Sequence, residues 1–290
     1  MNLSRITDWL FVLLQYSLPH HALSGIVHKI ARWRCPLLKN ILIRAYIRVF
    51  DVDMGLACEP GPENYDNFNQ FFTRALKPSV RVVNREGITC PVDGFVSQLG
   101  GIKATELFQA KGHYYDLEQL LASDNKMVEQ FRDGAFATLY LSPADYHRVH
   151  MPLQGKLNRL IYVPGKLFSV NARTTRLVKN LFTRNERIIS LFETDVGPMA
   201  IIMVGAILVG SMDTVWCGRV KPEDASTVTS WSYDGNNNNI ILNRGDEMGR
   251  FNMGSTVILL LGNKNVEWNA ALHPDSRIEM GTCLGKIRKA

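Results

Sequence analysis

Several features that mark whole classes of protein are missing from this sequence. The five cysteines are odd in number, widely spaced and form no Cys-x-x-Cys pair, which argues against a disulfide framework and a cysteine zinc site and favours a reducing compartment. There is no internal repeat and no linker rich enough to divide domains. With 290 residues, 46% of them hydrophobic, the chain can bury the core of one large domain or two small ones.

Long hydrophobic runs are also missing from the N-terminal part. The longest run there, residues 9–14, has six residues, whereas a membrane-spanning helix needs about 20. Only one early cation precedes this run and no small-residue cleavage site follows it, so it does not resemble a secretory signal. We therefore expect neither a membrane-spanning segment nor a signal peptide.

Acidic residues are nearly absent from residues 1–50, which contain seven lysines and arginines and the single acid Asp8. This segment carries the whole net charge of +6, and the remaining residues sum to zero. Large apolar side chains recur between the cations at helical spacing, and Pro19 and Pro36 interrupt the pattern. The pattern predicts amphipathic helices that lie peripherally on an anionic membrane surface. A basic face exposed to solvent is the alternative, and nucleic acid fits the many aliphatic side chains less well.

After residue 50 the pattern changes to short apolar segments between turn residues. We predict an α+β protein in which N-terminal amphipathic helices (1–75) are attached to a β-rich catalytic body (76–290). A short helix is expected at 66–72, and helices or an irregular excursion at 104–121 and 124–130. The expected strands are 95–99, 135–141, 156–163, 188–192, 199–209, 239–242, 257–261 and 283–287.

Three stretches contain residues suited to chemistry. Asp93 lies in an Asp-Gly pair that opens a strand, where an aspartate is also an ordinary turn residue. His147 and His150 follow the strand 135–141, but no third and fourth ligands for zinc lie near them. Ser255 follows Gly254 directly before an apolar run, where it could simply be the first residue of a strand. Asp, His and Ser are nevertheless the three types that activate a hydroxyl, although sequence separation cannot test their convergence.

Four motifs, in order and at similar intervals, resemble those of bacterial phosphatidylserine decarboxylase. They are Phe-Phe-Thr-Arg-Ala-Leu-Lys-Pro (71–78), Pro-Val-Asp-Gly (91–94), His-Arg-Val-His-Met-Pro (147–152) and Met-Gly-Ser-Thr (253–256). The resemblance runs from about residue 5 to the C-terminus. Met253 departs from the more frequent Leu of the family, a change that conserves volume and apolarity.

The resemblance implies that Ser255 takes part in a self-cleavage reaction that happens once in each chain. Its hydroxyl would attack the carbonyl of Gly254, the resulting ester would break by β-elimination to leave a dehydroalanine, and this would hydrolyse to a pyruvoyl group. The chain would become a β subunit (1–254) and an α subunit (255–290), and whether this pair dimerises further stays open. By the same resemblance His150 is the base and Asp93 its orienting partner. A glycine before the serine suits this chemistry because it lets a nucleophile approach the carbonyl.

The resemblance also implies the second reaction. The pyruvoyl ketone, the only cofactor expected, would form a Schiff base with phosphatidylserine and accept the electrons released with carbon dioxide, giving phosphatidylethanolamine for phospholipid biosynthesis. His147 is the candidate for proton transfer, with a structural histidine as the alternative. Arg74 and Lys77 are candidates for binding the headgroup phosphate, although both could be exposed charges. No metal is expected.

Two other classes of function remain open. A membrane-associated serine hydrolase could use the same Asp/His/Ser set, but the Gly-x-Ser-x-Gly elbow is missing and the chain would stay whole. A noncatalytic membrane-docking module would also keep Ser255 in one uncut chain.

Overall fold

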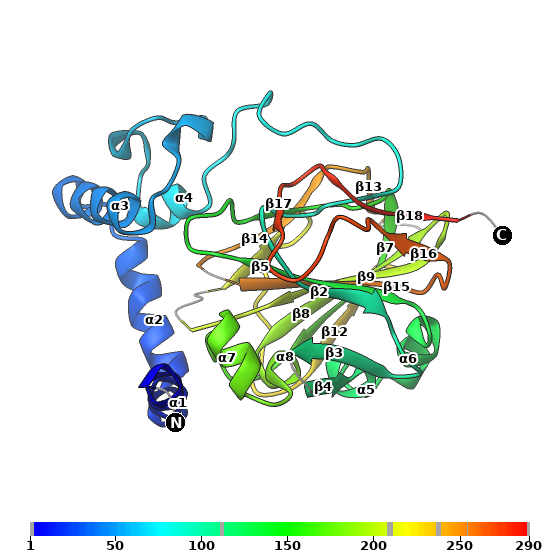
Figure 1. Cartoon of the computed structure of the whole chain (residues 1–290). Helices are drawn as coiled ribbons and strands as arrows, with labels where there is room; N and C mark the ends of the chain where they lie inside the picture. The colour runs from blue at the N-terminus through cyan, green and yellow to red at the C-terminus, as the bar shows by residue number, and fades with distance from the viewer. Residues whose placement is uncertain (1–2, 111–112, 208–210, 236–238, 254, 289–290) are drawn as a thin grey trace.

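The computed structural model describes residues 3–110, 113–207, 211–235, 239–253 and 255–288. Helices from the N-terminal part lie to one side of a body built of β-sheets (Figure 1). A long connection, residues 73–87, then passes over the body before the first of its strands. The predicted α+β class, with helices first and a β-rich body after them, is confirmed.

Three helices form the N-terminal part: α1 (Leu3–Ser17), α2 (His20–Ala31) and α3 (Pro36–Phe50). Pro19 directly precedes α2 and Pro36 is the first residue of α3. A proline lacks the backbone N–H that a helix interior requires, so each begins a new helix instead of continuing the previous one. Within the described residues no single helix has the length and apolar character to cross a membrane; α1 and α2 reach it only as a pair, bent by 87°.

A small apolar core joins α3 to the chain that follows it. The elements there are η1 (Met54–Leu56), η2 (Pro62–Asn64) and α4 (Phe68–Phe72), and the last agrees with the short helix predicted at 66–72. Phe68, Phe71 and Phe72 pack with Ile43 and Tyr65. Lys39, one of the seven N-terminal cations, is buried here and donates to the carbonyls of Pro62 and Tyr65. It is therefore not available to a membrane surface.

The centre of the body is an antiparallel sheet that has nine strands within the described residues. In spatial order they are β12 (Thr229–Ser232), β7 (Gly155–Val163), β8 (Arg187–Thr194), β9 (Gly197–Val204), β15 (Ser255–Leu261), β5 (Ala135–Leu141), β2 (Gly94–Gly101) and β17 (Arg277–Ile278), with β13 (Ile241–Leu242) paired to β7. Side chains of β15 alternate between two separate apolar clusters, one on each face of the sheet. Burial on both faces explains why this strand reads as an unbroken apolar run.

Different elements cover the two faces. Helices and a hairpin cover one (Figure 1): α5 (Leu117–Leu120), α6 (Asn125–Phe131), α7 (Ala172–Leu177), α8 (Leu181–Arg184), β3 (Glu106–Ala110) and β4 (His113–Asp116). Two small sheets cover the other: β1 (Ile88–Thr89), β18 (Cys283–Ile287) and β16 (Val266–Trp268), and β11 (Gly218–Arg219), β10 (Met212–Thr214), β14 (Glu247–Phe251) and β6 (Arg148–His150).

The predicted strands agree with the structure apart from their ends. Strands at 135–141 and 283–287 have the predicted bounds, whereas the strand predicted at 199–209 ends at Val204. The prediction of helices or an irregular excursion at 104–121 is wrong: β3 and β4 pair there as a hairpin, and among the described residues of this region only Leu117–Leu120 is helical. Its strands are short and carry several polar side chains, so they lack a long alternating pattern.

Candidate active site

Two strand pairings bring the predicted site residues to one end of the central sheet. Ser255, the first residue of β15, lies opposite Leu141, the last residue of β5. The chain then turns through residues 142–147 into β6, where His150 lies opposite Glu247 of β14. The backbone N–H of His150 donates to the carbonyl of Pro91, two residues before Asp93. Gly254 and the side chain of Ser255 lie outside the described residues.

Both ring nitrogens of His150 have hydrogen-bond partners. Nδ1 lies 2.8 Å from the carbonyl oxygen of Gly245, and Nε2 lies 2.9 Å from the hydroxyl of Tyr146. Burial lowers the pKa of His150 below its usual value, and the hydrogen bond to Gly245 acts in the opposite direction. The imidazole is thus held in place and is neutral near pH 7.

Asp93 is buried and has three hydrogen bonds of its own. Arg81 donates from Nε and Nη2 to its two carboxylate oxygens, at 3.0 and 2.6 Å, and the backbone N–H of Met280 donates at 2.7 Å. The bond to Asp93 raises the pKa of Arg81. No hydrogen bond among the described residues joins Asp93 to His150. The negative charge of Asp93 does act on His150, where it favours the protonated ring.

His147 is completely buried beside Phe72, with 4.1 Å between the ring centroids. Its Nδ1 donates to the carbonyl of Asp145 at 2.8 Å, which leaves the lone pair on Nε2. Nε2 is buried and has no hydrogen-bond partner among the described residues. Burial, supported by the positive charge of Arg74, lowers the pKa of His147 to about 3.

This burial predicts a pH-dependent stability. The unfolded chain binds a proton at His147 near pH 6.5, and the folded chain only near pH 3. Above about pH 6.5 the ring is neutral in both states and costs no stability. As the pH falls from there toward about 3, the unfolded chain takes up a proton that the folded chain does not, so the free energy of unfolding decreases. Between pH 7 and pH 5 we expect the free energy of unfolding to fall by about 2 kcal/mol more in the parent than in His147→Asn. Urea unfolding measures it, in a Ser255→Ala background that is chosen so that the predicted cut does not divide the chain. An equal pH dependence would contradict the assignment.

Arg74 and Lys77 occupy different environments. Arg74 is 4% exposed, and its Nη2 donates to the carbonyls of Ala144 and Asp145, at 2.9 and 3.4 Å. Its Nε and Nη1 are buried without a hydrogen-bond partner among the described residues. Burial lowers the pKa of Arg74. Lys77 is exposed and donates to the carbonyl of Gly55 at 2.7 Å.

Sequence reasoning missed Tyr146, Gly245 and Arg81. Tyr146 lies four residues before His150, inside a stretch already selected for its histidines, so its position was a signal. Gly245 is 95 residues from His150 and Arg81 is 12 residues from Asp93, and nothing in their sequence surroundings indicates these contacts.

Among the residues that the structure describes, no group of three or more His, Cys, Asp or Glu side chains could hold a metal ion. Nδ1 of His147 contacts the carbonyl of Asp145, whereas the two nitrogens of His150 contact Gly245 and Tyr146, so these contacts do not bring the two rings to one shared partner. Both imidazoles are neutral near pH 7, which is the form that can accept a proton.

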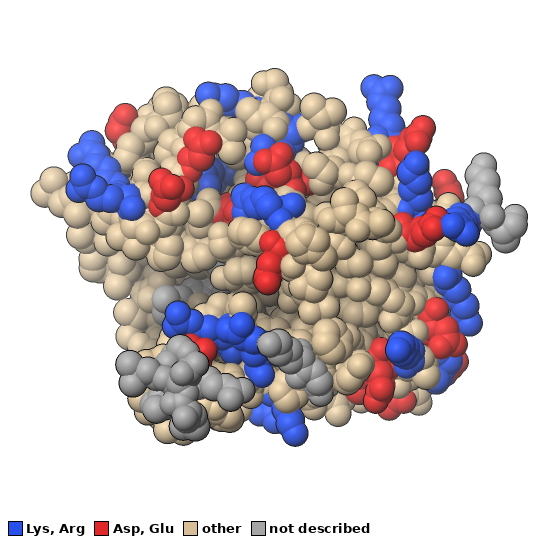
Figure 2. Space-filling model, in the orientation of Figure 1, with Lys and Arg blue, Asp and Glu red and all other residues tan. Residues whose placement is uncertain are grey.

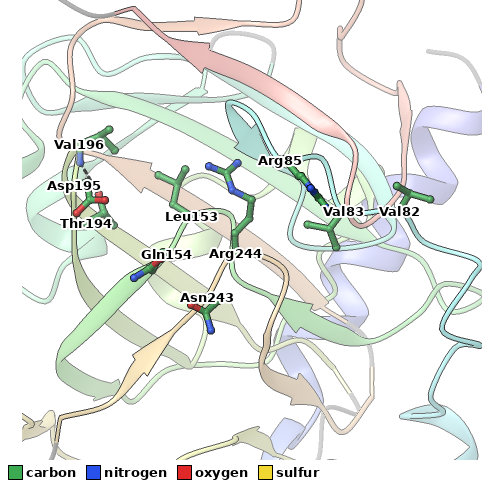
Figure 3. Close-up of a pocket in the computed structure, with 10 residues that line it drawn as sticks. All are labelled: Val82, Val83, Arg85, Leu153, Gln154, Thr194, Asp195, Val196, Asn243 and Arg244. Atoms are coloured by element: carbon green, nitrogen blue, oxygen red, sulfur yellow. Dashed lines mark hydrogen bonds between the residues drawn. The ribbon is translucent and has the colours of Figure 1, made fainter.

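Two hollows lie near these residues. An apolar groove of about 330 Å³ lies between α2 and α3, and Phe68 and Met253 also line it. Met253 is two residues before Ser255, so the groove reaches the segment that is predicted to be cut. An open cleft of about 730 Å³ is lined by Val83, Arg85 and Arg244 among others (Figure 3). None of its lining residues is a predicted site residue.

Comparisons with known proteins agree with the motif resemblance. The family model described as phosphatidylserine decarboxylase matches residues 68–286, and one described only as PSD matches residues 10–51. The phosphatidylserine decarboxylase proenzyme of Methylococcus capsulatus is 51% identical over 281 residues, 96% of this chain and 97% of the relative. The proenzymes of Saccharophagus degradans (97% of this chain, 98% of the relative) and Azotobacter vinelandii (96% and 98%) are 46% and 48% identical. The chain belongs to the phosphatidylserine decarboxylase family.

Proposed function

We propose that this protein converts phosphatidylserine to phosphatidylethanolamine and carbon dioxide in phospholipid biosynthesis, using a pyruvoyl group made from Ser255 by self-cleavage. One observation carries the proposal: in a chain similar along its length to proenzymes of this activity, a Gly-Ser bond directly precedes a strand held on both sides. The serine hydrolase alternative has no support in the comparisons.

The strand pairings fit a cut between residues 254 and 255. The new terminus would begin β15, whose residues pair with β5 and β9. The C-terminal fragment also contributes β17, paired to β2, and β18, paired to β1. Three strands of the C-terminal fragment, β15, β17 and β18, therefore pair with strands of the N-terminal fragment. The two fragments would therefore remain one folded unit, with the reactive group fixed at the end of a central strand.

In the proposed self-cleavage, His150 takes the proton of the Ser255 hydroxyl, which then attacks the carbonyl of Gly254. A neutral imidazole is the form that can accept this proton, and burial maintains it near pH 7. Asp93 stabilises the imidazolium that results, through its charge. A pyruvoyl group supplies a ketone that condenses with the substrate amine and accepts the electrons released with carbon dioxide.

His147 is proposed to transfer protons during decarboxylation. Its Nε2 is the acceptor atom, since Nδ1 donates to the Asp145 carbonyl and no described residue occupies Nε2. Nε2 can accept a hydrogen bond from the amine of the substrate. Arg74 and Lys77 are proposed to bind the headgroup phosphate: Arg74 has two nitrogens without a partner among the described residues, and Lys77 lies at the surface.

A peripheral position on the cytoplasmic side of the cell membrane is proposed from the surface of the N-terminal helices. Large apolar side chains are exposed on all three helices and on the link between α2 and α3: Trp9, Leu10, Leu13, Leu14, Ile26, Leu37, Ile41 and Val49 on the helices, and Trp33 on the link. Lys29, Arg34, Arg44 and Arg48 are exposed among them, and Figure 2 shows basic side chains at the outer end of the helical part. Exposed apolar and basic side chains on one set of helices suit an anionic lipid surface. The apolar groove would offer the lipid tails a surface beside the cleavage segment.

Replacing two exposed leucines tests this position. Leu13 and Leu37 are 66% and 74% exposed, so Leu13→Glu/Leu37→Glu should leave the fold intact. We expect binding to anionic phospholipid vesicles to fall at least about tenfold, because each leucine stabilises a lipid-bound state by up to roughly 1.5–3 kcal/mol. Vesicle co-sedimentation measures it. Val82→Glu is the matched control, since Val82 is 82% exposed on the connection to the body. Equal vesicle binding by the double variant and the parent would refute the proposal.

The proposed function is tested directly on purified protein. Self-cleavage predicts fragments of 254 and 36 residues from the 290-residue chain, the smaller one lacking a free amino terminus and reacting with carbonyl reagents. Incubation with carboxyl-labelled phosphatidylserine should release labelled carbon dioxide. An uncut 32.7 kDa chain with full activity would exclude the pyruvoyl mechanism. An uncut chain without decarboxylation would favour the hydrolase or the membrane-docking module.

A further inference from the structure

The two hydrogen bonds of the His150 ring determine which of its nitrogens is the base. A carbonyl oxygen can only accept, so Nδ1 must donate to Gly245 and carry the ring proton. The lone pair of the neutral ring is then on Nε2, and the hydroxyl of Tyr146 donates to it. These two contacts fix the tautomer as well as the direction of the ring. A hydrogen-bonded partner has this effect on the histidine of a Ser-His-Asp triad, where the partner is the aspartate.

Asp93 does not make this contact in the described structure. Its carboxylate receives Arg81 and the backbone N–H of Met280. Met280 belongs to the segment that follows the proposed cut, so Asp93 connects the two fragments. Asp93 acts on His150 through charge, and the orientation of the ring comes from other residues.

The turn that carries Gly245 is fixed against Met151, the residue directly after His150. The N–H of Gly245 donates to the carbonyl of Met151, and the N–H of Met151 donates to the carbonyl of Asp246. Gly245 has φ +82°, a left-handed conformation that favours glycine. A Cβ there would lie 2.8 and 2.9 Å from the two methyl carbons of Val83. Figure 3 shows Val83 and Arg244, the neighbour of Gly245, lining the same cleft. A larger residue at 245 would therefore displace the carbonyl that holds Nδ1.

We infer that Tyr146 and Gly245 are the positioning residues of His150: they hold the ring in the tautomer whose lone pair is on Nε2, the atom that accepts the proton of Ser255. The inference rests on the proposed function, in which His150 is the base. The hydroxyl of Ser255 first replaces that of Tyr146 on the single lone pair of Nε2, and Nε2 then takes the Ser255 proton. No other proton moves, and the oxygen of Ser255 is then free to attack the carbonyl of Gly254.

Several charged and polar groups around His150 influence the pKa of its ring, and the Tyr146 hydroxyl is one of them. Glu247 and Arg148 form an ion pair at 2.8 Å and act on the ring with opposite signs, and Asp93 adds a negative charge. The Gly245 carbonyl favours the protonated ring. The Tyr146 hydroxyl donates to the neutral ring and so favours the deprotonated one. Removing the hydroxyl alone should raise the pKa of His150.

The variant Tyr146→Phe tests this without removing the ring that packs on His150, at 5.6 Å between centroids. Chains made by cell-free synthesis are moved to buffers from about pH 5 to about pH 9, and the loss of the intact chain is followed on gels. We expect cleavage to slow about three- to tenfold near pH 7, and the acidic limb of the rate profile to move up by about half to one pH unit. Tyr162→Phe, which loses a comparable bond to Glu186, should leave the profile unchanged.

A second pair of variants tests Gly245. Gly245→Ala should slow cleavage at least about tenfold, and Val83→Ala added to it should restore part of the rate by removing the methyl carbons that the new Cβ meets. A purely structural role of Tyr146 would lower the amount of folded protein and leave the pH profile in place. Wild-type cleavage with a wild-type profile in Tyr146→Phe would overturn the inference. So would a shifted limb in Asp93→Asn together with none in Tyr146→Phe. A parent chain that is never cut would instead refute the proposed function.

Discussion

Replacing Ser255 with alanine is expected to leave the protein as one 32.7 kDa chain and to lower decarboxylation by roughly a thousandfold or more. The substitution removes the oxygen that attacks the Gly254 carbonyl and also the atoms from which the pyruvoyl group would form. Its effect on folding should be small, because Ser255 lies at the beginning of β15 and the pairs from Thr256 onward hold the strand. Gel electrophoresis, intact mass and release of labelled carbon dioxide measure the outcome.

Thr256 provides a matched control in the same strand. Its hydroxyl is buried and has no hydrogen-bond partner among the described residues, so Thr256→Val removes a hydroxyl one residue later at nearly constant volume. We expect this variant to be cut at a rate close to that of the parent. Efficient cutting of Ser255→Ala would show that another residue supplies the nucleophile. An uncut Thr256→Val would mean that the hydroxyl of Thr256 contributes to the reaction.

Replacing His147 with alanine is expected to separate the two reactions. The variant should still be cut, because His150 has contacts that do not involve His147. Its kcat per mole of cleaved protein should fall by about 10²- to 10⁴-fold, the range for loss of a positioned proton-transfer group. The cut fraction is measured on gels and the turnover by release of carbon dioxide from phosphatidylserine.

A structural role for His147 would give a different pattern. The substitution leaves a cavity beside Phe72, so the free energy of unfolding must be measured in parallel. His273→Ala is the control: His273 lies in the C-terminal fragment, and its ring contacts the carbonyl of Pro274 at the surface. Normal turnover in cleaved His147→Ala would remove this histidine from the mechanism. Reduced amounts of folded protein with normal turnover per cut chain would make it a packing residue.

The strands and helix breaks were largely readable from the sequence, and local chemistry explains why. Pro19 and Pro36 act on their own neighbours, so their effect is visible without a fold. The segment 135–141 is apolar on both sides because β5 is buried on both faces, and its bounds agreed with the prediction. The β3–β4 hairpin was missed because its identity depends on pairing between short segments, not on a pattern inside either one.

The candidate site divides in the same way. Asp93, His147, His150 and Ser255 each lie in a short continuous motif, so the residue types and their order could be recognised in the sequence. The hydrogen-bond partners of these residues could not be recognised in the sequence. Local composition and spacing determined the class of fold and the basic helical N-terminus, and the resemblance of four motifs to a known family implied the segment expected to be cut. Only the tertiary structure decided that His150 is held by Tyr146 and Gly245 while Asp93 binds Arg81, since hydrogen-bond partners are chosen by which strands and turns meet in space.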